Sequence, residues 1–193
     1  MLRKSLNFDV VIVGAGFAGM YMLHRLKQQG LSAVVFEAGD DVGGTWYWNR
    51  YPGARCDAES LAYSFSFSSE LEQEWEWSER YAQQSEILEY ARHVSRRFDL
   101  RKDIRFETSV TSAHYQDDSL NWHVETDKGD TVVASFCVMA TGCLSVPLLP
   151  DIPGVQNFKG NLYQASKWPH QPVSFKNQRV GIIGTGSSGI QAI

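Results

Sequence analysis

Two glycine-rich turns with identical spacing constrain the fold of this chain more than any other feature. Residues 14–19 read GAGFAG and residues 184–189 read GTGSSG, so both fit the pattern GxGxxG. A short run rich in β-branched residues precedes each turn, at residues 9–13 and at residues 179–183. A strand that enters such a turn and leaves it as a helix begins a doubly wound α/β fold, in which the turn binds a pyrophosphate. The chain therefore contains two candidate dinucleotide sites.

The first turn lies within a complete strand-helix-strand pattern. Apolar residues keep helical spacing over residues 20–26, Gly30 ends the helix, and residues 33–36 predict a second strand. Glu37 ends that strand, 21 residues after Gly16, where dinucleotide-binding folds place the acid that hydrogen-bonds a ribose hydroxyl. Taken alone, Glu37 has the alternative role of a solvated carboxylate at a strand end. The register of all these features favours dinucleotide binding.

The glycines of the first turn have separate predicted roles. Gly14 permits the tight turn, Gly16 lets the backbone approach the pyrophosphate, and Gly19 lets the helix pack against the strand. The amino end of the helix then faces the phosphates. The residues assigned to this cofactor-binding turn are Gly14, Gly16, Phe17, Ala18 and Gly19.

The loop of residues 43–57, GGTWYWNRYPGARCD, is rich in aromatic residues and has no regular period. Three interpretations are open: a loop folded back on the core, a surface for a partner protein, or the wall of a flat aromatic cofactor. Its position directly after the strand-helix-strand unit favours the cofactor wall. Asp57, which follows Arg50 and Arg55, has the alternative role of a local ion-pair partner.

The remaining sequence predicts that the sheet carries an antiparallel hairpin. Residues 104–110 predict a strand, and residues 122–126 and 131–136 predict the two strands of the hairpin. Residues 138–142 predict a further buried strand that ends in a turn of small residues. Ser85 is expected to be the N-cap of an amphipathic helix that packs on the core.

Composition restricts the classes of function. A formal charge of −4, with basic residues scattered among acidic ones, gives no electrostatic footprint for nucleic acid or an anionic membrane. The chain has no run of about 20 apolar residues that predicts a membrane helix. Its three cysteines and five histidines have neither disulfide-framework nor metal-ligand spacing. We therefore expect a cytoplasmic protein that acts on a small molecule.

The segment before the second glycine turn carries a signature. Residues 158–169, FKGNLYQASKWP, resemble the pattern FxGxxxHxxxWP of the class I Baeyer–Villiger monooxygenases, within the flavin-containing monooxygenase superfamily. The loop of residues 43–57 and the ATG of residues 140–142 also resemble that family. The likeness covers nearly all of the chain from Phe8 onward. One departure is Gln164, which replaces the histidine of the signature.

The resemblance implies two cofactors, FAD on the first glycine turn and NADPH on the second. It implies that Glu37 binds the adenosine ribose and that Asp57, in the catalytic site, holds a catalytic arginine that lies further along the family's chain than Ile193. For FAD, the further residues implied are Gly44, Thr45, Trp46, Asp57, Tyr63 and Val110. For NADPH, they are Gly184, Thr185, Gly186, Ser187, Ser188 and Gly189.

The activity implied is the reduction of FAD by NADPH and the use of O2 to insert one oxygen atom next to a ketone carbonyl, giving an ester or a lactone. Two alternatives remain open. One is a flavin monooxygenase that oxidises nitrogen or sulfur, and the other is a nucleotide-binding module without catalysis. The small-molecule ketone and O2 are the expected partners, with no nucleic acid and no membrane.

The expected architecture is α/β. A Rossmann-like FAD-binding domain at residues 1–150 has a parallel sheet with an antiparallel hairpin excursion, residues 151–178 form a connector, and residues 179–193 begin an NADP-binding domain. Only four residues follow Gly189, so we expect an N-terminal fragment or truncated product that is inactive alone.

Within the connector, Phe158 and Trp168 are expected to be anchors. Gln164 is expected to keep the bridging role of the family's histidine without titrating near neutral pH. The alternative is a harmless substitution in a surface linker.

Overall fold

The computed structural model describes residues 6–193, and the chain divides into two compact units. Unit 1 holds the chain up to Tyr47 together with residues 91–143, and unit 2 holds residues 48–90 and 144–193. Helix α4 (Gln84–Arg97) contributes residues to both units.

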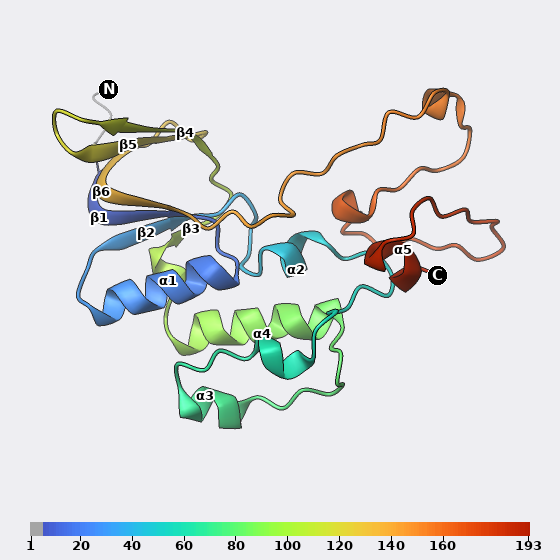
Figure 1. Cartoon of the computed structure of the whole chain (residues 1–193), viewed down its shortest axis with the longest axis horizontal. Coiled ribbons are helices and arrows are strands. Elements are labelled where there is room, and N and C mark those ends of the chain that lie inside the picture. Colours follow the sequence, from blue (N-terminus) through green and yellow to red (C-terminus); the bar gives the residue numbers. More distant parts are fainter. Residues whose placement is uncertain (1–5) are drawn as a thin grey trace. The chain divides into compact units, whose positions relative to one another are not determined.

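Unit 1 is built on one six-stranded sheet with the order β3-β2-β1-β6-β5-β4 (Figure 1). The strands are β1 (Leu6–Val13), β2 (Ala33–Phe36), β3 (Ile104–Arg105), β4 (Val110–Gln116), β5 (Asn121–Thr126) and β6 (Thr131–Met139). Strands β3, β2, β1 and β6 are parallel, whereas β5 runs antiparallel to β6 and to β4. The predicted parallel sheet with an antiparallel hairpin is therefore confirmed, and the hairpin extends the same sheet.

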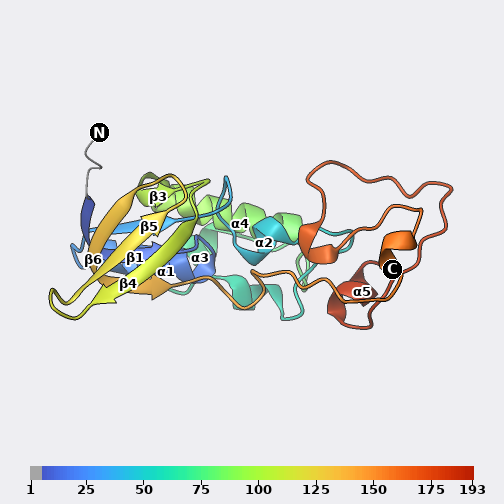
Figure 2. The ribbon, with the colours of Figure 1, turned by 90° about the horizontal axis from the view of Figure 1, so that it is seen from above.

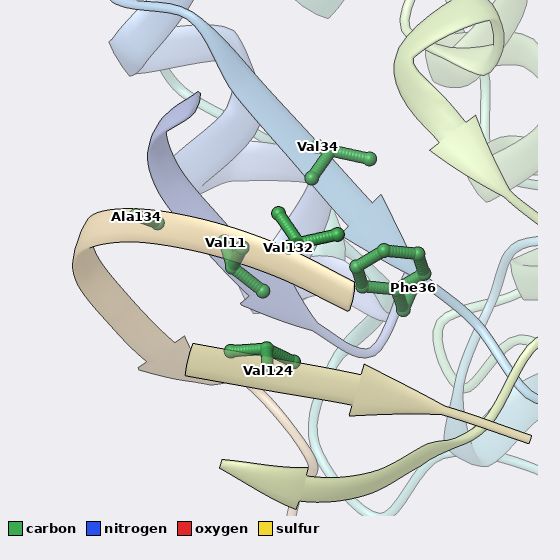
Figure 3. Close-up of a cluster of buried hydrophobic side chains, with 6 residues drawn as sticks. All are labelled: Val11, Val34, Phe36, Val124, Val132 and Ala134. Carbon is green, nitrogen blue, oxygen red and sulfur yellow. The ribbon is translucent and has the colours of Figure 1, made fainter. Parts of the chain in front are cut away.

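The core of unit 1 lies on both faces of the central strands. The run VVIV in β1 is almost continuously apolar, as expected for a parallel strand that is covered on two sides. Helix α1 (Phe17–Gln28) covers one face of the sheet, and the twisted antiparallel edge of β4 and β5 lies over the parallel strands (Figures 1 and 2). The buried cluster drawn in Figure 3 comes from β1, β2, β5 and β6: Val11, Val34, Phe36, Val124, Val132 and Ala134.

The predicted strand at residues 104–110 is wrong over most of its length. Only Ile104 and Arg105 pair with β2, and Glu107 has a positive φ of 51°. The amide of Thr108 donates to the carbonyl of Glu37 at 2.9 Å, so this segment follows the chain beyond the end of β2. Strand β4, which begins at Val110 and which the sequence analysis missed, forms the antiparallel edge of the sheet.

Two other boundaries also differ from prediction. Of the strand predicted at residues 138–142, only residues 138–139 are in a strand: they are the end of β6, where they pair with β1, and residues 140–142 form no strand. Helix α4 begins at Gln84, one residue before the expected N-cap Ser85. The carbonyl of Gln83 accepts from the amides of Glu86 and Ile87, so Gln83 occupies the capping position.

Unit 2 has short helices and little sheet. Its elements include the 3-10 turn η1 (Ser60–Tyr63), α3 (Ser69–Glu74) and α5 (Ser187–Gln191), while the one-turn helix α2 (Thr45–Trp48) spans its boundary with unit 1. The strand predicted at residues 179–183 is wrong, because these residues form no strand and Ile183 is 82% exposed. A strand needs a neighbour for its backbone groups, and no segment within residues 6–193 pairs with this one.

Candidate functional site

The first glycine turn lies at the carboxyl end of β1, where neighbouring strands end on both sides. The amide of Gly14 donates to the carbonyl of Phe36 at the end of β2, at 2.8 Å. A Cβ atom on Gly14 would lie 2.7 Å from the carbonyl oxygen of Ala140, just after β6. Strand β1 connects to β2 on one side and has β6 on the other, so the strand order reverses here. Ligands of open α/β sheets bind at this kind of switch point.

The backbone of the turn needs its glycines. Gly14 has a φ of +101°, which side chains rarely tolerate. A Cβ atom on Gly19 would lie 1.9 Å from the carbonyl oxygen of Gly14, so only glycine lets α1 pack this close to the strand. Gly16 is the N-cap of α1 and no side chain caps its amides. Those amide donors are suited to a phosphate.

The loop after β2 lies against this turn, although 28 residues separate Gly16 from Gly44 in the sequence. The amide of Gly43 donates to the carbonyl of Ala15 at 3.1 Å. A Cβ atom on Gly44 would lie 2.9 Å from the Cα of Gly16, and Gly44 has a φ of +55°. Thr45, which is exposed, follows at once as the first residue of α2, with the half-buried Trp46 beside it in sequence. The structure thus brings the predicted wall to the predicted turn.

Glu37 is a buried bridge between these two segments. Its side chain is 4% exposed, so the alternative of a solvated carboxylate is wrong. Oε2 accepts from the amide of Ala15 at 2.7 Å, and Oε1 accepts from the amide of Gly39 at 2.8 Å. A carboxylate has about four acceptor positions, so capacity remains for a ribose hydroxyl. The ribose contact itself stays a prediction.

An ionic triad, which the sequence analysis missed, supports the loop after β2. Asp41 accepts from Arg92 Nε at 2.7 Å and from Arg101 Nη1 at 2.6 Å. Burial raises the pKa of Asp41, but the hydrogen bonds from Arg101 and Arg92 outweigh this effect and the pKa is lowered. Asp41 also accepts from the amide of the buried Val42, next to Gly43. No local pattern marks this triad, because its members are 51 and 60 residues apart from Asp41.

The second glycine turn, in unit 2, repeats the geometry of the first. Gly184 has a φ of +122°, and Gly186 is the N-cap of α5 with a φ of −76° and a ψ of 175°. The corresponding Gly16 has a φ of −73° and a ψ of −171°. A Cβ atom on Gly189 would lie 2.6 Å from the carbonyl oxygen of Gly184. Three predicted NADPH contacts, Thr185, Ser187 and Ser188, are exposed at this turn.

Asp57 also lies in unit 2, and its partner comes from α5. Asp57 Oδ1 accepts from Gln191 Nε2 at 3.0 Å. Arg55 forms an ion pair with Glu79 at 3.2 Å, so the alternative pairing of Arg55 with Asp57 is wrong. The sequence analysis missed Gln191, for which no motif gave a signal. Of the two remaining predicted FAD contacts, Tyr63 ends η1 and is half-buried in unit 2, and Val110 begins β4 in unit 1.

The connector is irregular, as predicted, and only one of its expected anchors is packed. The ring of Trp168 lies 5.3 Å from that of Tyr163 and 6.0 Å from that of Phe175. Phe158 is 62% exposed, so its predicted anchoring role is wrong for this structure. Gln164 Nε2 donates to the carbonyl of Leu148 at 2.9 Å, while its buried Oε1 has no hydrogen-bond partner.

Two further observations bear on the class of site. Within residues 6–193, no cluster of three or more His, Cys, Asp or Glu side chains is arranged to hold a metal ion. No helix in this described part is both long enough and apolar enough to cross a bilayer.

Comparison with protein families gives one match over nearly the whole chain. The model of a family described as flavin-binding monooxygenase-like matches residues 7–193. A Baeyer-Villiger monooxygenase of Pseudooceanicola batsensis is 46% identical over 188 residues, which are 97% of this chain and 34% of that protein. An acetone monooxygenase (methyl acetate-forming) of a Gordonia species is 43% identical, over 98% of this chain and 36% of its own length.

A solved structure and a relative named for a different reaction also match. A solved structure of an oxidised steroid monooxygenase bound to NADP is 58% identical and has a TM-score of 0.91, covering 96% of this chain and 36% of that one. A phenazine N-monooxygenase of Lysobacter antibioticus is 43% identical over 97% of this chain and 35% of that protein. The chain therefore spans about a third of the length of the relatives that it matches.

Proposed function

Because this chain belongs to the flavin-binding monooxygenase-like family, we propose that it is the N-terminal part of an FAD- and NADPH-dependent monooxygenase. Its reaction is the insertion of one oxygen atom from O2 next to a ketone carbonyl, which gives an ester or a lactone. The observation that carries the proposal is the presence in one chain of two glycine turns with the same backbone geometry. Two such turns suit two dinucleotides, one that is reduced and one that supplies the electrons.

The first turn fits the pyrophosphate of FAD. The backbones of Gly16 and Gly44 can approach each other closely because neither residue carries a side chain, and Gly14 supplies the positive φ of the turn. The amides at the start of α1 would bind the phosphates, and Glu37 would bind the adenosine ribose. The other proposed FAD contacts are Phe17, Ala18, Gly19, Thr45, Trp46, Asp57, Tyr63 and Val110. When bound, FAD supplies the redox chemistry and the activation of O2.

The second turn fits the pyrophosphate of NADPH in the same way. Gly184 and Gly186 open the backbone, and the amides from Ser187 onward are the donors at the start of α5. The steroid monooxygenase structure that resembles this chain has NADP bound, which supports the assignment. We propose the domain division accordingly, with an FAD-binding domain at residues 1–150, a connector at residues 151–178 and the start of an NADP-binding domain at residues 179–193.

The protein's own residues would orient the reactants and exclude water. Asp57 carries a carboxylate at the surface of unit 2 that would hold an arginine in place by a charge-assisted hydrogen bond. Such an arginine would stabilise negative charge that develops during oxygen transfer. The aromatic Trp46 and Tyr63 would shield the cofactor from water.

The proposed substrate is a small ketone, with O2 as co-substrate, in the cytoplasm. The names of two relatives, a Baeyer-Villiger monooxygenase and an acetone monooxygenase that forms methyl acetate, support a ketone. Oxidation of nitrogen is the second candidate, because the phenazine N-monooxygenase is similar to this chain to the same degree.

The test joins residues 1–193 to the remainder of the Gordonia acetone monooxygenase, in place of that enzyme's own N-terminal part. We expect the hybrid protein to retain FAD, to oxidise NADPH faster when a ketone is added, and to form the corresponding ester. The native acetone monooxygenase is the positive control. A hybrid that retains FAD but converts an aromatic N-heterocycle to its N-oxide, with no ester from any ketone, would favour the second candidate. A folded hybrid without FAD would contradict both.

A further inference from the structure

The side chain of Gln191 forms four hydrogen bonds, all of them to the loop of residues 51–57 in unit 2. Its Oε1 accepts from the Tyr51 hydroxyl at 2.8 Å and from the Arg55 amide at 3.3 Å. Its Nε2 donates to the Arg55 carbonyl at 3.1 Å and to Asp57 Oδ1 at 3.0 Å. A primary amide offers two acceptor positions and two donors, so these four bonds satisfy it completely.

The backbone around Gln191 supports the same contact. A Cβ atom on Gly53 would lie 1.9 Å from the carbonyl oxygen of Gln191, and Gly53 has a φ of +76°. The close approach of α5 to the loop of residues 51–57 at this point therefore requires a glycine. The isolated β-bridge between Arg55 and Gln83 gives this loop a second attachment within unit 2.

The position of Gln191 gives this contact a functional meaning. Gln191 is the last residue of α5, two residues after Gly189 of the second glycine turn. Asp57 is the residue proposed to hold the catalytic arginine. We infer that Gln191 is a positioning residue that couples the NADPH-binding turn to the carboxylate of Asp57. The inference rests on the proposed function for its consequence in catalysis, whereas the contact itself is a property of this chain.

Asp57 is exposed, so in the absence of a partner its side chain would sample several rotamers. The bond from Gln191 Nε2 selects one of them, and the second carboxylate oxygen keeps acceptor capacity for a guanidinium. A dinucleotide that orders α5 would also order Gln191, and with it Asp57.

The first experiment measures amide hydrogen exchange in the purified chain of residues 1–193. Gln191→Leu should speed exchange at the Arg55 amide by at least about tenfold, because a lost hydrogen bond of roughly 1.4 kcal/mol corresponds to that factor. Gln178→Leu, at an exposed glutamine of the same unit, is the matched control and should leave Arg55 unchanged. Unchanged exchange at Arg55 in Gln191→Leu would overturn the inference.

A second variant distinguishes loss of the hydrogen bond between Gln191 and Asp57 from a general loss of stability. Gln191→Glu keeps acceptors for Tyr51 and Arg55 but removes both donors and places a negative charge next to Asp57. We expect it to retain the protection of the Arg55 amide while it changes the NMR shift of the Asp57 side-chain carboxyl carbon. Equal carboxyl shifts in wild type, Gln191→Leu and Gln191→Glu would show that Gln191 does not position Asp57.

The third experiment uses the hybrid monooxygenase described above. Gln191→Leu and Gln191→Glu should each slow ester formation by about tenfold at saturating NADPH and ketone, at unchanged FAD content. In an Asp57→Asn background, Gln191→Leu should have no further effect, because the two residues act as one unit. Additive effects would overturn the coupling. If the unsubstituted hybrid is inactive, the proposed function fails. The hydrogen-exchange result still decides whether Gln191 holds the loop of residues 51–57.

Discussion

The two glycine turns have the same backbone and opposite surroundings. Gly14 and Gly184 both have φ values above +100°, and the helix after each turn starts from a glycine N-cap in an extended conformation. A Cβ atom on Gly14 would collide with Ala140, whereas one on Gly184 would meet nothing within 4 Å. The strand before the first turn has neighbours on both sides, and the residues before the second have none within the described chain. The geometry of the turn therefore depends on its own few residues, whereas a strand forms only where neighbouring segments pair with it.

The largest expected contrast is between two isoleucines in corresponding segments. Ile12 in β1 is fully buried, whereas Ile182 before the second turn is 41% exposed. Ile12→Ala should lower the free energy of unfolding by about 3–4 kcal/mol through lost burial and a cavity, and Ile182→Ala by less than about 0.5 kcal/mol. Urea unfolding monitored by circular dichroism provides the measurement. Equal losses would mean that residues 179–183 are packed in solution, which would remove the contrast.

The next contrast concerns the last glycine of each turn. Gly19→Ala places a methyl group 1.9 Å from the Gly14 carbonyl oxygen in a closely packed region. It should destabilise unit 1 by about 2–3 kcal/mol, because neither the helix nor the strand can move away. Gly189→Ala meets the Gly184 oxygen at 2.6 Å, but that turn is open and can shift, so we expect less than about 1 kcal/mol. The urea midpoints of the two variants should differ accordingly, and a reversed order would show that the first turn is the more adaptable.

Glu37 provides a contrast in binding, because the second turn has no residue in this chain that corresponds to it. In Glu37→Gln, one side-chain oxygen remains, and it can accept from only one of the amides of Ala15 and Gly39. The new NH2 group faces the other amide, so two donors meet there. The loss should be about 2 kcal/mol in stability, with FAD affinity lowered at least tenfold. Fluorescence titration of the hybrid protein with FAD measures the affinity, and NADPH affinity should not change. Unaltered FAD binding would exclude Glu37 from the flavin site.

The smallest expected effect comes from the ionic triad beside the first turn. Asp41→Asn should lower stability by about 1.5 kcal/mol at pH 7, because it weakens two charge-assisted hydrogen bonds. The pKa of Asp41 is lowered from its ordinary 3.8, so the triad stabilises the fold above about pH 4 and this contribution is lost as the pH falls through the folded-state pKa. The stabilities of wild type and Asp41→Asn should therefore start to converge as the pH falls below 3.8. A difference that does not shrink below that pH would show that the charge of Asp41 is not responsible.

Most of the first unit could be predicted because its signals are local and repeat at short range. The strand at residues 33–36 and the helix that Gly30 ends have the predicted positions. The predictions failed where pairing with distant segments decides the structure. Residues 106–109 look like a strand, but hydrogen bonds to the chain after β2 hold them in another conformation. Residues 138–139 lie in β6 because β1 pairs with them.

The sequence by itself determined the two glycine turns, because a positive φ and a close approach of helix to strand depend on which residues lack a side chain. It also determined the first strand-helix-strand unit and the hairpin of β5 and β6. Only the tertiary structure decided which turn is enclosed, that Glu37 and Gly44 meet the first turn, and that Gln191 reaches Asp57. The physical reason is that each of these contacts joins residues between 22 and 134 positions apart, and such pairings follow from how the whole chain buries its apolar surface.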